Sequence, residues 1–364
     1  TSIGENKDER IRTIVATSDG GYIVGGCFSS DEIQVGKDKL INNGSSDAII
    51  IKYSSAGEVE WVSSVGGNSS ECIYSVVATN DGGYIAGGYF NSSIQIENDK
   101  LISNGDDDGF IIKYSSRGKV EWTKGIGGTN SDKIFAVDQT NDRGIIVGGD
   151  LYSEKILIGD YILTNTTPRN YFDGMIIKFD YKELNVPIVT NVNGVGGNNY
   201  EYINLVEETN SGGYIAAGRY YSSTLQVGDY ILNNNSMSTD YADVAIIKYN
   251  STGEVEWASN IGGRDEEEVT SISATSDGGC IVSGYFYSSK IEVGEYTLNN
   301  SGTTYENGMI IKYSSTGEVE WATSVGGIKK ESVQSVSETT DGGYIAGGSF
   351  SSSEIQVGKD KLIS

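Results

Sequence analysis

One short phrase, Asp-Gly-Gly-Tyr-Ile or a near copy of it, returns six times along this chain of 364 residues. The intervals between successive copies are 62, 61, 69, 66 and 64 residues. A recurring period of this size indicates a repeat architecture. Because most of the notable residues recur once per repeat, their first explanation is structural. The copies begin at Asp19, Asp81, Asp142, Ser211, Asp277 and Asp341.

Each period contains four strand-like runs and none with helical spacing. In the second copy, residues 73–79 alternate apolar and small side chains, residues 80–83 supply turn residues, and residues 84–90 return as a second strand. Residues 110–114 read as a buried third strand and residues 119–122 as a fourth. Four antiparallel strands per unit, repeated about a ring, predict an all-β fold, the β-propeller. A recurring Ile-x-Val-Gly segment followed by Leu predicts a small extra hairpin on each blade.

The repeats predict a single propeller domain over residues 1–364, with five complete blades and a partial sixth. The sixth copy supplies two strands and the small hairpin, and residues 1–4 resemble the end of a fourth strand. Either the natural chain continues, or the last blade is incomplete and its edge is open to pairing, including self-association. The repeats span about residues 1–61, 62–122, 123–189, 190–257, 258–321 and 322–364.

Composition excludes several classes of partner. The net charge of −24 argues against nucleic acid, because a binder must neutralise phosphates. No apolar run approaches the length of a membrane span, so no membrane insertion is expected. The cysteines, Cys27, Cys72 and Cys280, occupy different repeat positions, which favours separate thiols over a disulfide framework.

The combined motifs resemble the bacterial β-propeller repeat family of secreted and surface proteins. The likeness covers essentially the whole chain. It implies the propeller fold and export to the outside or the surface of a bacterial cell. It implies no particular reaction, since propellers host many unrelated functions. In the second copy the matching residues are Gly66-Gly67, Glu71, residues 81–84, residues 88–90, Leu101, Asp108, residues 110–114, Gly118 and Trp122.

Every copy also places an acidic residue ten positions before its turn. This position begins the innermost strand of a propeller blade, so the six acids are expected around one mouth of the central channel. Such a ring could hold a cation. The alternative, which we favour, is that each carboxylate accepts backbone N–H bonds from the adjacent Gly-Gly turn, so that no metal or cofactor is predicted. The acids are Glu9, Glu71, Asp132, Glu201, Glu267 and Glu331.

Departures from the repeat point to a ligand. The loops between the hairpin and the third strand are longer in copies three to five, and they carry aromatic residues. Aromatic side chains on lengthened loops suggest recognition of a glycan or a protein, with drift in a tolerant loop as the alternative. The expected docking segments are residues 164–172, 233–242 and 299–306. The candidate ligand-binding residues are Arg169, Tyr171, Phe172, Tyr241 and Tyr305.

Catalysis has little support in this sequence. The chain contains no His, which removes histidine-based triads, and no carboxylate pair stands apart from the repeats. The sequence therefore predicts a non-catalytic binding or adhesion module, secreted or on the cell surface. The alternative is a structural element of a larger extracellular assembly, joined through the incomplete blade. A polysaccharide-active enzyme is the third hypothesis.

Overall fold

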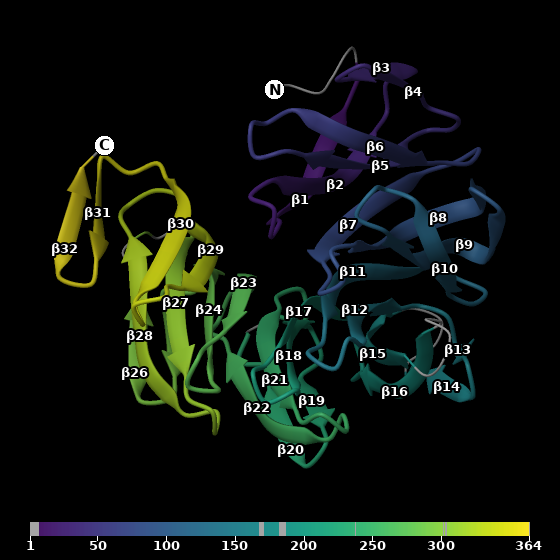
Figure 1. Cartoon of the computed structure of the whole chain (residues 1–364). Coiled ribbons are helices and arrows are strands. Elements are labelled where there is room, and N and C mark those ends of the chain that lie inside the picture. The colour runs from purple at the N-terminus through teal and green to yellow at the C-terminus, as the bar shows by residue number, and fades with distance from the viewer. Residues whose placement is uncertain are drawn as a thin grey trace. The chain divides into compact units, whose positions relative to one another are not determined.

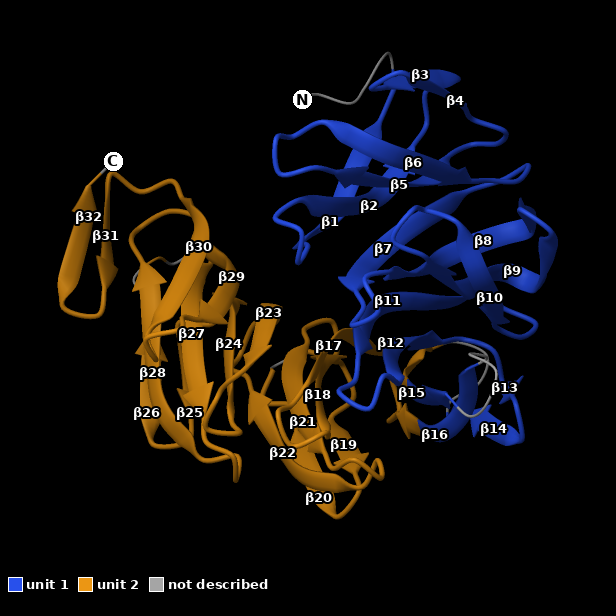
Figure 2. Cartoon of the chain, viewed as in Figure 1, with its two compact units in different colours: residues 1–169, 177–192 blue, residues 170–176, 193–364 orange. Residues whose placement is uncertain are grey.

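The computed structural model describes residues 7–166, 171–181, 187–236, 238–300, 302 and 304–363 (Figure 1). These residues form strands, turns and bends. Within that part of the chain, no helix has the length and apolar character that a membrane crossing requires. The chain divides into two compact units, Thr1–Arg169 with Ile177–Val192 and Asn170–Ile176 with Asn193–Ser364 (Figure 2).

Five antiparallel sheets, four of them with four strands and the fifth extended to six, follow one another along the chain and contain the four-stranded blades of a β-propeller. Within each sheet, strands that succeed one another in the blade are neighbours. The first two blades are β1 (Glu9–Ala16), β2 (Tyr22–Phe28), β5 (Asp47–Tyr53) and β6 (Val59–Val65), then β7 (Glu71–Ala78), β8 (Tyr84–Ile96), β9 (Asp99–Tyr114) and β10 (Val120–Ile126). The third is β11 (Asp132–Gln139), β12 (Ile145–Leu151), β15 (Asp173–Tyr181) and β16 (Pro187–Val195). The last two are β17 (Glu201–Glu208), β18 (Tyr214–Tyr220), β21 (Asp243–Tyr249) and β22 (Val255–Ile261), then β23 (Glu267–Ala274), β24 (Cys280–Phe286), β27 (Asn307–Tyr313) and β28 (Val319–Gly326).

The predicted small hairpins lie between the second and third strands of the blades. In the second blade the hairpin is continuous with β8 and β9, whose pairing extends to Ile96 and Asp99. The separate hairpins are β3 (Glu32–Val35) with β4 (Asp38–Ile41), β13 (Lys155–Ile158) with β14 (Tyr161–Thr164), β19 (Thr224–Val227) with β20 (Tyr230–Asn233), and β25 (Lys290–Val293) with β26 (Tyr296–Asn299).

The sixth repeat does not form a blade. Its strands β29 (Glu331–Glu338) and β30 (Tyr344–Phe350) make a two-stranded sheet of their own. The hairpin of β31 (Glu354–Val357) and β32 (Asp360–Ile363) instead extends the fifth blade by pairing with β28. The five predicted blades are therefore present, whereas the partial sixth blade is not supported, because no described third or fourth strand completes the β29–β30 sheet.

The turn between the first and second strands of each blade is stabilised by hydrogen bonds among its own residues. In the second repeat, Asp81 Oδ1 accepts hydrogen bonds from the hydroxyl of Thr79 and, at 2.9 Å, from the N–H of Gly83. Gly82 between them has a φ of +81°, in the left-handed region that favours glycine. In the third repeat Arg143 takes this place with a φ of +70°, so that turn is strained.

Neighbouring blades of the first unit pack through glycines on their second strands. A Cβ at Gly25 would lie 2.6 Å from Ile73 Cγ2, and one at Gly87 would lie 2.5 Å from Val137 Cγ1. The side chain of the next blade thus fills the space that a larger residue would need. Ile23, Ile73 and their neighbours form one continuous buried cluster across this boundary.

The structure corrects the interpretation of two cysteines. Cys27 and Cys72 form a disulfide that links β2 of the first blade to β7 of the second, both in the first unit. Cys280 is a buried free thiol, and its burial raises its pKa to about 12. The expectation of separate thiols was wrong for Cys27 and Cys72, because different positions in successive repeats meet where two blades pack together.

Candidate functional site

The six recurring acids hold backbone groups at the start of each first strand. Five of them are buried, and Glu9 is half-buried. Backbone N–H groups that follow the second strand also donate to some of them, as Tyr152 and Ser153 do to Asp132 at 2.9 Å and Ser30 does to Glu9 at 3.1 Å. These contacts lie within one repeat and tie the end of its second strand to the start of its first strand. The N–H of the preceding Gly-Gly pair donates from Gly67 to Glu71 (2.8 Å), Gly128 to Asp132 (2.8 Å), Gly197 to Glu201 (2.9 Å), Gly263 to Glu267 (2.9 Å) and Gly327 to Glu331 (3.0 Å).

Burial changes the protonation of three of these carboxyls. It raises the pKa of Glu71 and Glu201 to about 7 and that of Glu267 to about 8, against the opposing effect of the hydrogen bonds they accept. A carboxyl that is partly protonated at neutral pH is a weak cation ligand. Among the described residues, no group of three or more His, Cys, Asp or Glu side chains is placed to hold a metal ion.

A cluster of five aromatic rings lies in the second unit. Tyr171 and Phe172 precede β15, Tyr200 and Tyr202 flank the start of β17, and Tyr221 follows β18. The ring centroids of Tyr171 and Tyr200 are 4.8 Å apart, and those of Phe172 and Tyr202 are 5.7 Å apart. Tyr221 is 6.3 Å from Tyr200 and 6.4 Å from Tyr202. All five rings are half-buried. We call this cluster the aromatic surface.

A hollow of about 500 Å³ opens on the aromatic surface. Tyr171, Tyr200, Tyr202 and Tyr221 line it together with the polar residues Asn199, Thr239 and Asp240. The side-chain amide of Asn199 donates to the carbonyl oxygen of Thr239 at 3.1 Å, which anchors the loop that carries Asp240. The hollow therefore combines aromatic faces with an exposed carboxylate and carbonyl groups, the combination typical of small ligand sites.

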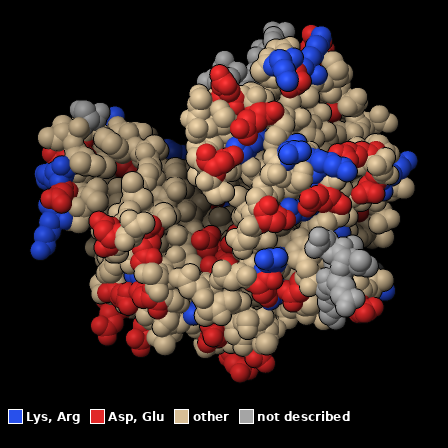
Figure 3. Space-filling view, in the orientation of Figure 1, with Lys and Arg blue, Asp and Glu red and all other residues tan. Residues whose placement is uncertain are grey.

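Charged residues support the aromatic surface. The guanidinium of Arg219 lies 5.8 Å from the ring centroid of Tyr202. It is held there by ion pairs to Glu266 at 3.1 Å and Glu268 at 3.3 Å. The hydroxyl of Tyr285 donates to Glu268 at 2.6 Å. Acidic side chains are also spread over the face of the molecule in Figure 3. Arg219, the cation that the described residues place beside the rings, is thus already paired with two carboxylates, and the described surround is acidic.

The structure brings together only part of the predicted set. Tyr171 and Phe172 lie in the aromatic surface, whereas Tyr241 and Tyr305 are 39% and 49% exposed and make no ring contact among the described residues. Arg169 lies outside the described residues. Tyr200, Tyr202 and Tyr221 were not predicted from the sequence. The available signal was that only the fourth repeat carries Tyr200 and Tyr202 where the second carries Ser70 and Cys72.

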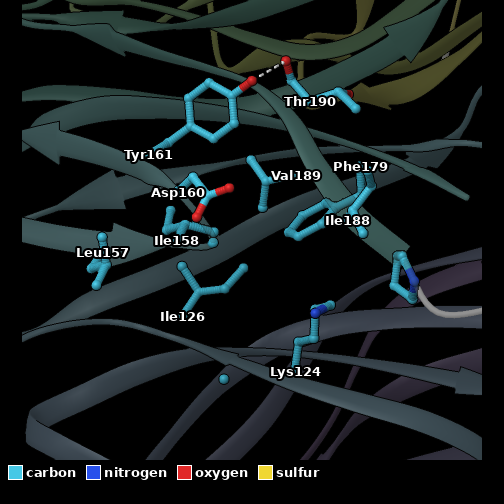
Figure 4. Close-up of a pocket in the computed structure, with 13 residues that line it drawn as sticks. Lys124, Ile126, Leu157, Ile158, Asp160, Tyr161, Phe179, Ile188, Val189 and Thr190 are labelled. Carbon is cyan, nitrogen blue, oxygen red and sulfur yellow. Dashed lines mark hydrogen bonds between the residues drawn. The ribbon is translucent and has the colours of Figure 1, made fainter. Parts of the chain in front are cut away.

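A second hollow, of about 640 Å³, lies in the first unit between the end of β10, the β13–β14 hairpin and the start of β16 (Figure 4). Polar and apolar groups contribute almost equally to its walls. Lys124 and Asp160 are among the lining residues, and the hydroxyl of Tyr161 donates to the carbonyl oxygen of Thr190 at 2.9 Å. The equivalent gap in the first blade is narrower. A Cβ added at Gly36 would lie 3.0 Å from Val59 Cβ, whereas a Cβ added at the equivalent Gly159 would lie 3.7 Å from Val189 Cβ. This hollow is therefore a widened form of a gap that recurs with the repeat.

Comparisons with known proteins leave the family open. The sequence matches no known protein-family model and no curated protein. Among solved structures, Sqt1 from Chaetomium thermophilum is similar over 90% of this chain and 74% of its own, with 10% identity and a TM-score of 0.40. A likeness of that strength assigns no function, and the suggested bacterial repeat family is not shown. The sheets of the chain itself define its class, a β-propeller repeat protein with five four-stranded blades.

Proposed function

We propose that the chain is a non-catalytic binding module whose ligand docks on the aromatic surface. The observation that carries this proposal is the 500 Å³ hollow lined by four tyrosines and rimmed by Asn199 and Asp240. Half-buried aromatic rings that line a hollow present part of their apolar faces to a ligand. Propeller scaffolds commonly support such surfaces on rigid strands.

The ligand we infer is a glycan or a basic protein segment. Sugar rings stack on tyrosine faces, and the carboxylate of Asp240 would accept hydrogen bonds from their hydroxyls. A basic segment would instead exploit the acidic surround and the net charge of −24. We place the module outside the cell or on a bacterial cell surface. The Cys27–Cys72 disulfide supports this location, because such bonds persist in oxidising compartments.

A glycan array and a basic peptide library, each screened with the whole chain, test this function. The variant Tyr171→Ala/Tyr221→Ala should lose binding to the ligand found, while circular dichroism should show that the blades remain folded, because both side chains are only half-buried. Tyr305→Ala is the matched control, since it removes a tyrosine that lies outside the hollow. Binding that survives the double variant, or that is lost equally in the control, would place the ligand elsewhere.

A second candidate function is that of a structural element in a larger extracellular assembly. The observation that favours it is β30, whose seven residues are all exposed. Size-exclusion chromatography with light scattering distinguishes the two functions. A monodisperse monomer favours the binding module, and concentration-dependent oligomers favour the assembly.

A further inference from the structure

The turn between the first and second strands holds a carboxylate with the same donors in four of the five blades. One oxygen of the turn aspartate accepts hydrogen bonds from a threonine hydroxyl and a glycine N–H, and the other pairs with a buried lysine of the third strand. Donors from two strands therefore recognise each carboxylate. The lysine pairs are Lys52–Asp19 (2.9 Å), Lys113–Asp81 (3.0 Å), Lys178–Asp142 (3.1 Å) and Lys312–Asp277 (2.7 Å).

The fourth blade keeps these donors and lacks the carboxylate. Thr209, Gly213 and Lys248 occupy the equivalent positions, but the turn carries Ser211 in place of the aspartate. Ser211 Oγ lies 3.0 Å from Thr209 Oγ1, so the serine hydroxyl replaces the first aspartate oxygen. Because serine has a single side-chain oxygen, this turn supplies no counterpart of the oxygen that pairs with the lysine.

The ammonium of Lys248 consequently has different partners from its equivalents. Its Nζ donates to the carbonyl oxygens of Gly278 at 3.1 Å and Ser315 at 3.2 Å, which lie in two turns of the fifth blade. In the first blade, Lys52 Nζ instead donates to the carbonyl oxygen of the adjacent Tyr53 at 2.9 Å. Neutral carbonyl groups of the next blade thus stand in for the missing carboxylate.

A hollow of about 440 Å³ lies beside this turn. Ser211 and Lys248 line it, together with Trp257 and, from the fifth blade, Ser315 and Thr316. Lys248 is buried, at 5% exposure. A buried ammonium at the wall of a hollow favours an anionic ligand, because charge-assisted hydrogen bonds are stronger than those between neutral groups. The hollow is larger than a carboxylate, so it has room for the rest of an organic acid.

The acidic neighbour of Lys248 is compatible with an anion at this place. Glu256 pairs with Lys248 at 3.2 Å. In the first blade, the ammonium of Lys52 carries two carboxylates, Asp19 at 2.9 Å and Glu60 at 3.1 Å. The same arrangement therefore holds a second carboxylate in another blade, whereas in the fourth blade the chain supplies only one.

We propose that the turn of the fourth blade binds a small organic carboxylate, which takes the place of the missing aspartate side chain. The ligand carboxylate accepts hydrogen bonds from the hydroxyl of Ser211 and from the ammonium of Lys248, which exchanges its neutral acceptors in the fifth blade for a charged one. The remainder of the acid lies in the hollow beside Trp257. This inference goes beyond the proposed function and does not involve the aromatic surface.

Calorimetric titration of the whole chain with acetate and benzoate tests the site. Each acid should bind saturably at one site per chain. Acetamide and benzamide, which match the acids in shape but carry no charge, should bind at least tenfold more weakly. Tighter binding of inorganic phosphate than of either acid would overturn the choice of ligand class. Absence of saturation up to about 10 mM of both acids, ten times a millimolar Kd, would overturn the site itself.

A substitution that restores the residue of the other blades locates the binding. Ser211→Asp should weaken benzoate binding at least tenfold, because its own carboxylate would pair with Lys248. The chain should remain folded, since four blades already carry aspartate there. Ser289→Asp is the matched control, because it adds the same charge at an exposed position outside the hollow and should bind benzoate as the parent chain does.

Two outcomes of this comparison would refute the assignment. Undiminished binding by Ser211→Asp would place the acid elsewhere, and an equal loss in Ser289→Asp would attribute the effect to net charge. The variant Tyr171→Ala/Tyr221→Ala should bind benzoate as the parent chain does, so a failure of this proposal and a failure of ligand binding at the aromatic surface are detected separately. Loss of benzoate binding in that double variant would move the acid to the aromatic surface and overturn the site.

Discussion

Gly87 and Gly347 occupy the same position in the second strands of the second and sixth repeats, but their surroundings are opposite. A Cβ at Gly87 would lie 2.5 Å from Val137 Cγ1 and 2.9 Å from Ile134 Cγ2, whereas a Cβ at Gly347 would meet no atom within 4 Å. Neither glycine has a positive φ, so alanine is compatible with both backbones. Replacing each by alanine therefore isolates the effect of blade packing.

The magnitude follows from these distances. Carbon atoms in contact normally lie about 3.5–4.0 Å apart, so the methyl group at residue 87 must push the next blade back by roughly 1 Å. Overpacking of this kind costs about 1–3 kcal/mol, and the lower chain entropy of alanine returns about 0.5–1 kcal/mol. Gly87→Ala should thus lower the free energy of unfolding by about 1 kcal/mol, within a range of roughly 0–2.5 kcal/mol. Gly347→Ala should be neutral or stabilising by about 0.5 kcal/mol.

The fourth repeat shows that the backbone at this position accepts alanine, so the expected loss of stability comes from the side chains of the next blade. It carries Ala217 at this position, in one buried cluster with Val269 and Ile272 of the next blade. Gly25→Ala is therefore the internal replicate, because a Cβ there would meet Ile73 at 2.6 Å and should be as costly as at Gly87.

Urea unfolding followed by tryptophan fluorescence measures these differences, and hydrogen exchange at Ile134 and Val137 shows whether a loss is local to the packed boundary. The slope of free energy against urea should match that of the parent chain. If Gly87→Ala and Gly347→Ala have the same effect, or if Gly25→Ala is harmless, the packing argument fails.

Three further predictions concern the disulfide, the buried acids and the strained turn. Replacing Cys27 and Cys72 by Ser should lower the free energy of unfolding by about 4 kcal/mol, the loop-closure entropy expected for a disulfide that joins residues 45 positions apart. Thiol titration of the unfolded, unreduced chain should detect only Cys280, and detection of three thiols would refute the disulfide. Burial raises the pKa of Glu267 to about 8 in the folded chain, against 4.5 in the unfolded chain. Between these two pH values the folded chain therefore binds a proton at Glu267 that the unfolded chain has released. The contribution of Glu267 to the free energy of unfolding is complete below about pH 4.5 and is lost as the pH rises to about 8. Glu267→Gln should therefore reduce the decline of the urea midpoint over this pH range. An unchanged dependence of the midpoint on pH would contradict the assignment. Arg143→Gly should raise the melting temperature, with a gain of about 1 kcal/mol from relief of the left-handed φ, and a lower melting temperature would show that the arginine side chain stabilises the turn.

The features of the fold that could be predicted from the sequence are those whose contacts lie inside one repeat. The Asp81 turn, the apolar third strand and the order of the four strands are local, so their spacing predicted the blades. The Cys27–Cys72 bond joins different positions of neighbouring repeats and carries no periodic signal. The aromatic surface was predicted in part through Tyr171 and Phe172.

The members that were not predicted, Tyr200, Tyr202 and Tyr221, lie at strand ends and not in the lengthened loops. Their proximity to Tyr171 depends on the packing of β15 and β17, as the hydrogen bond from the N–H of Glu201 to the carbonyl of Phe172 at 2.8 Å illustrates. Spacing along the chain does not encode that approach.

In a repeat protein, each residue can be compared with the residues at the equivalent position of the other repeats. Positions that differ from their equivalents are the places where function should be sought. Lys52 and its equivalents, although buried and charged, are accounted for because the same partners recur around them. Tyr202 is a tyrosine where the repeat elsewhere has none, and its half-buried ring lines a hollow. Blade packing does not require this departure, so it is better explained by something that binds the chain than by the stability of the fold.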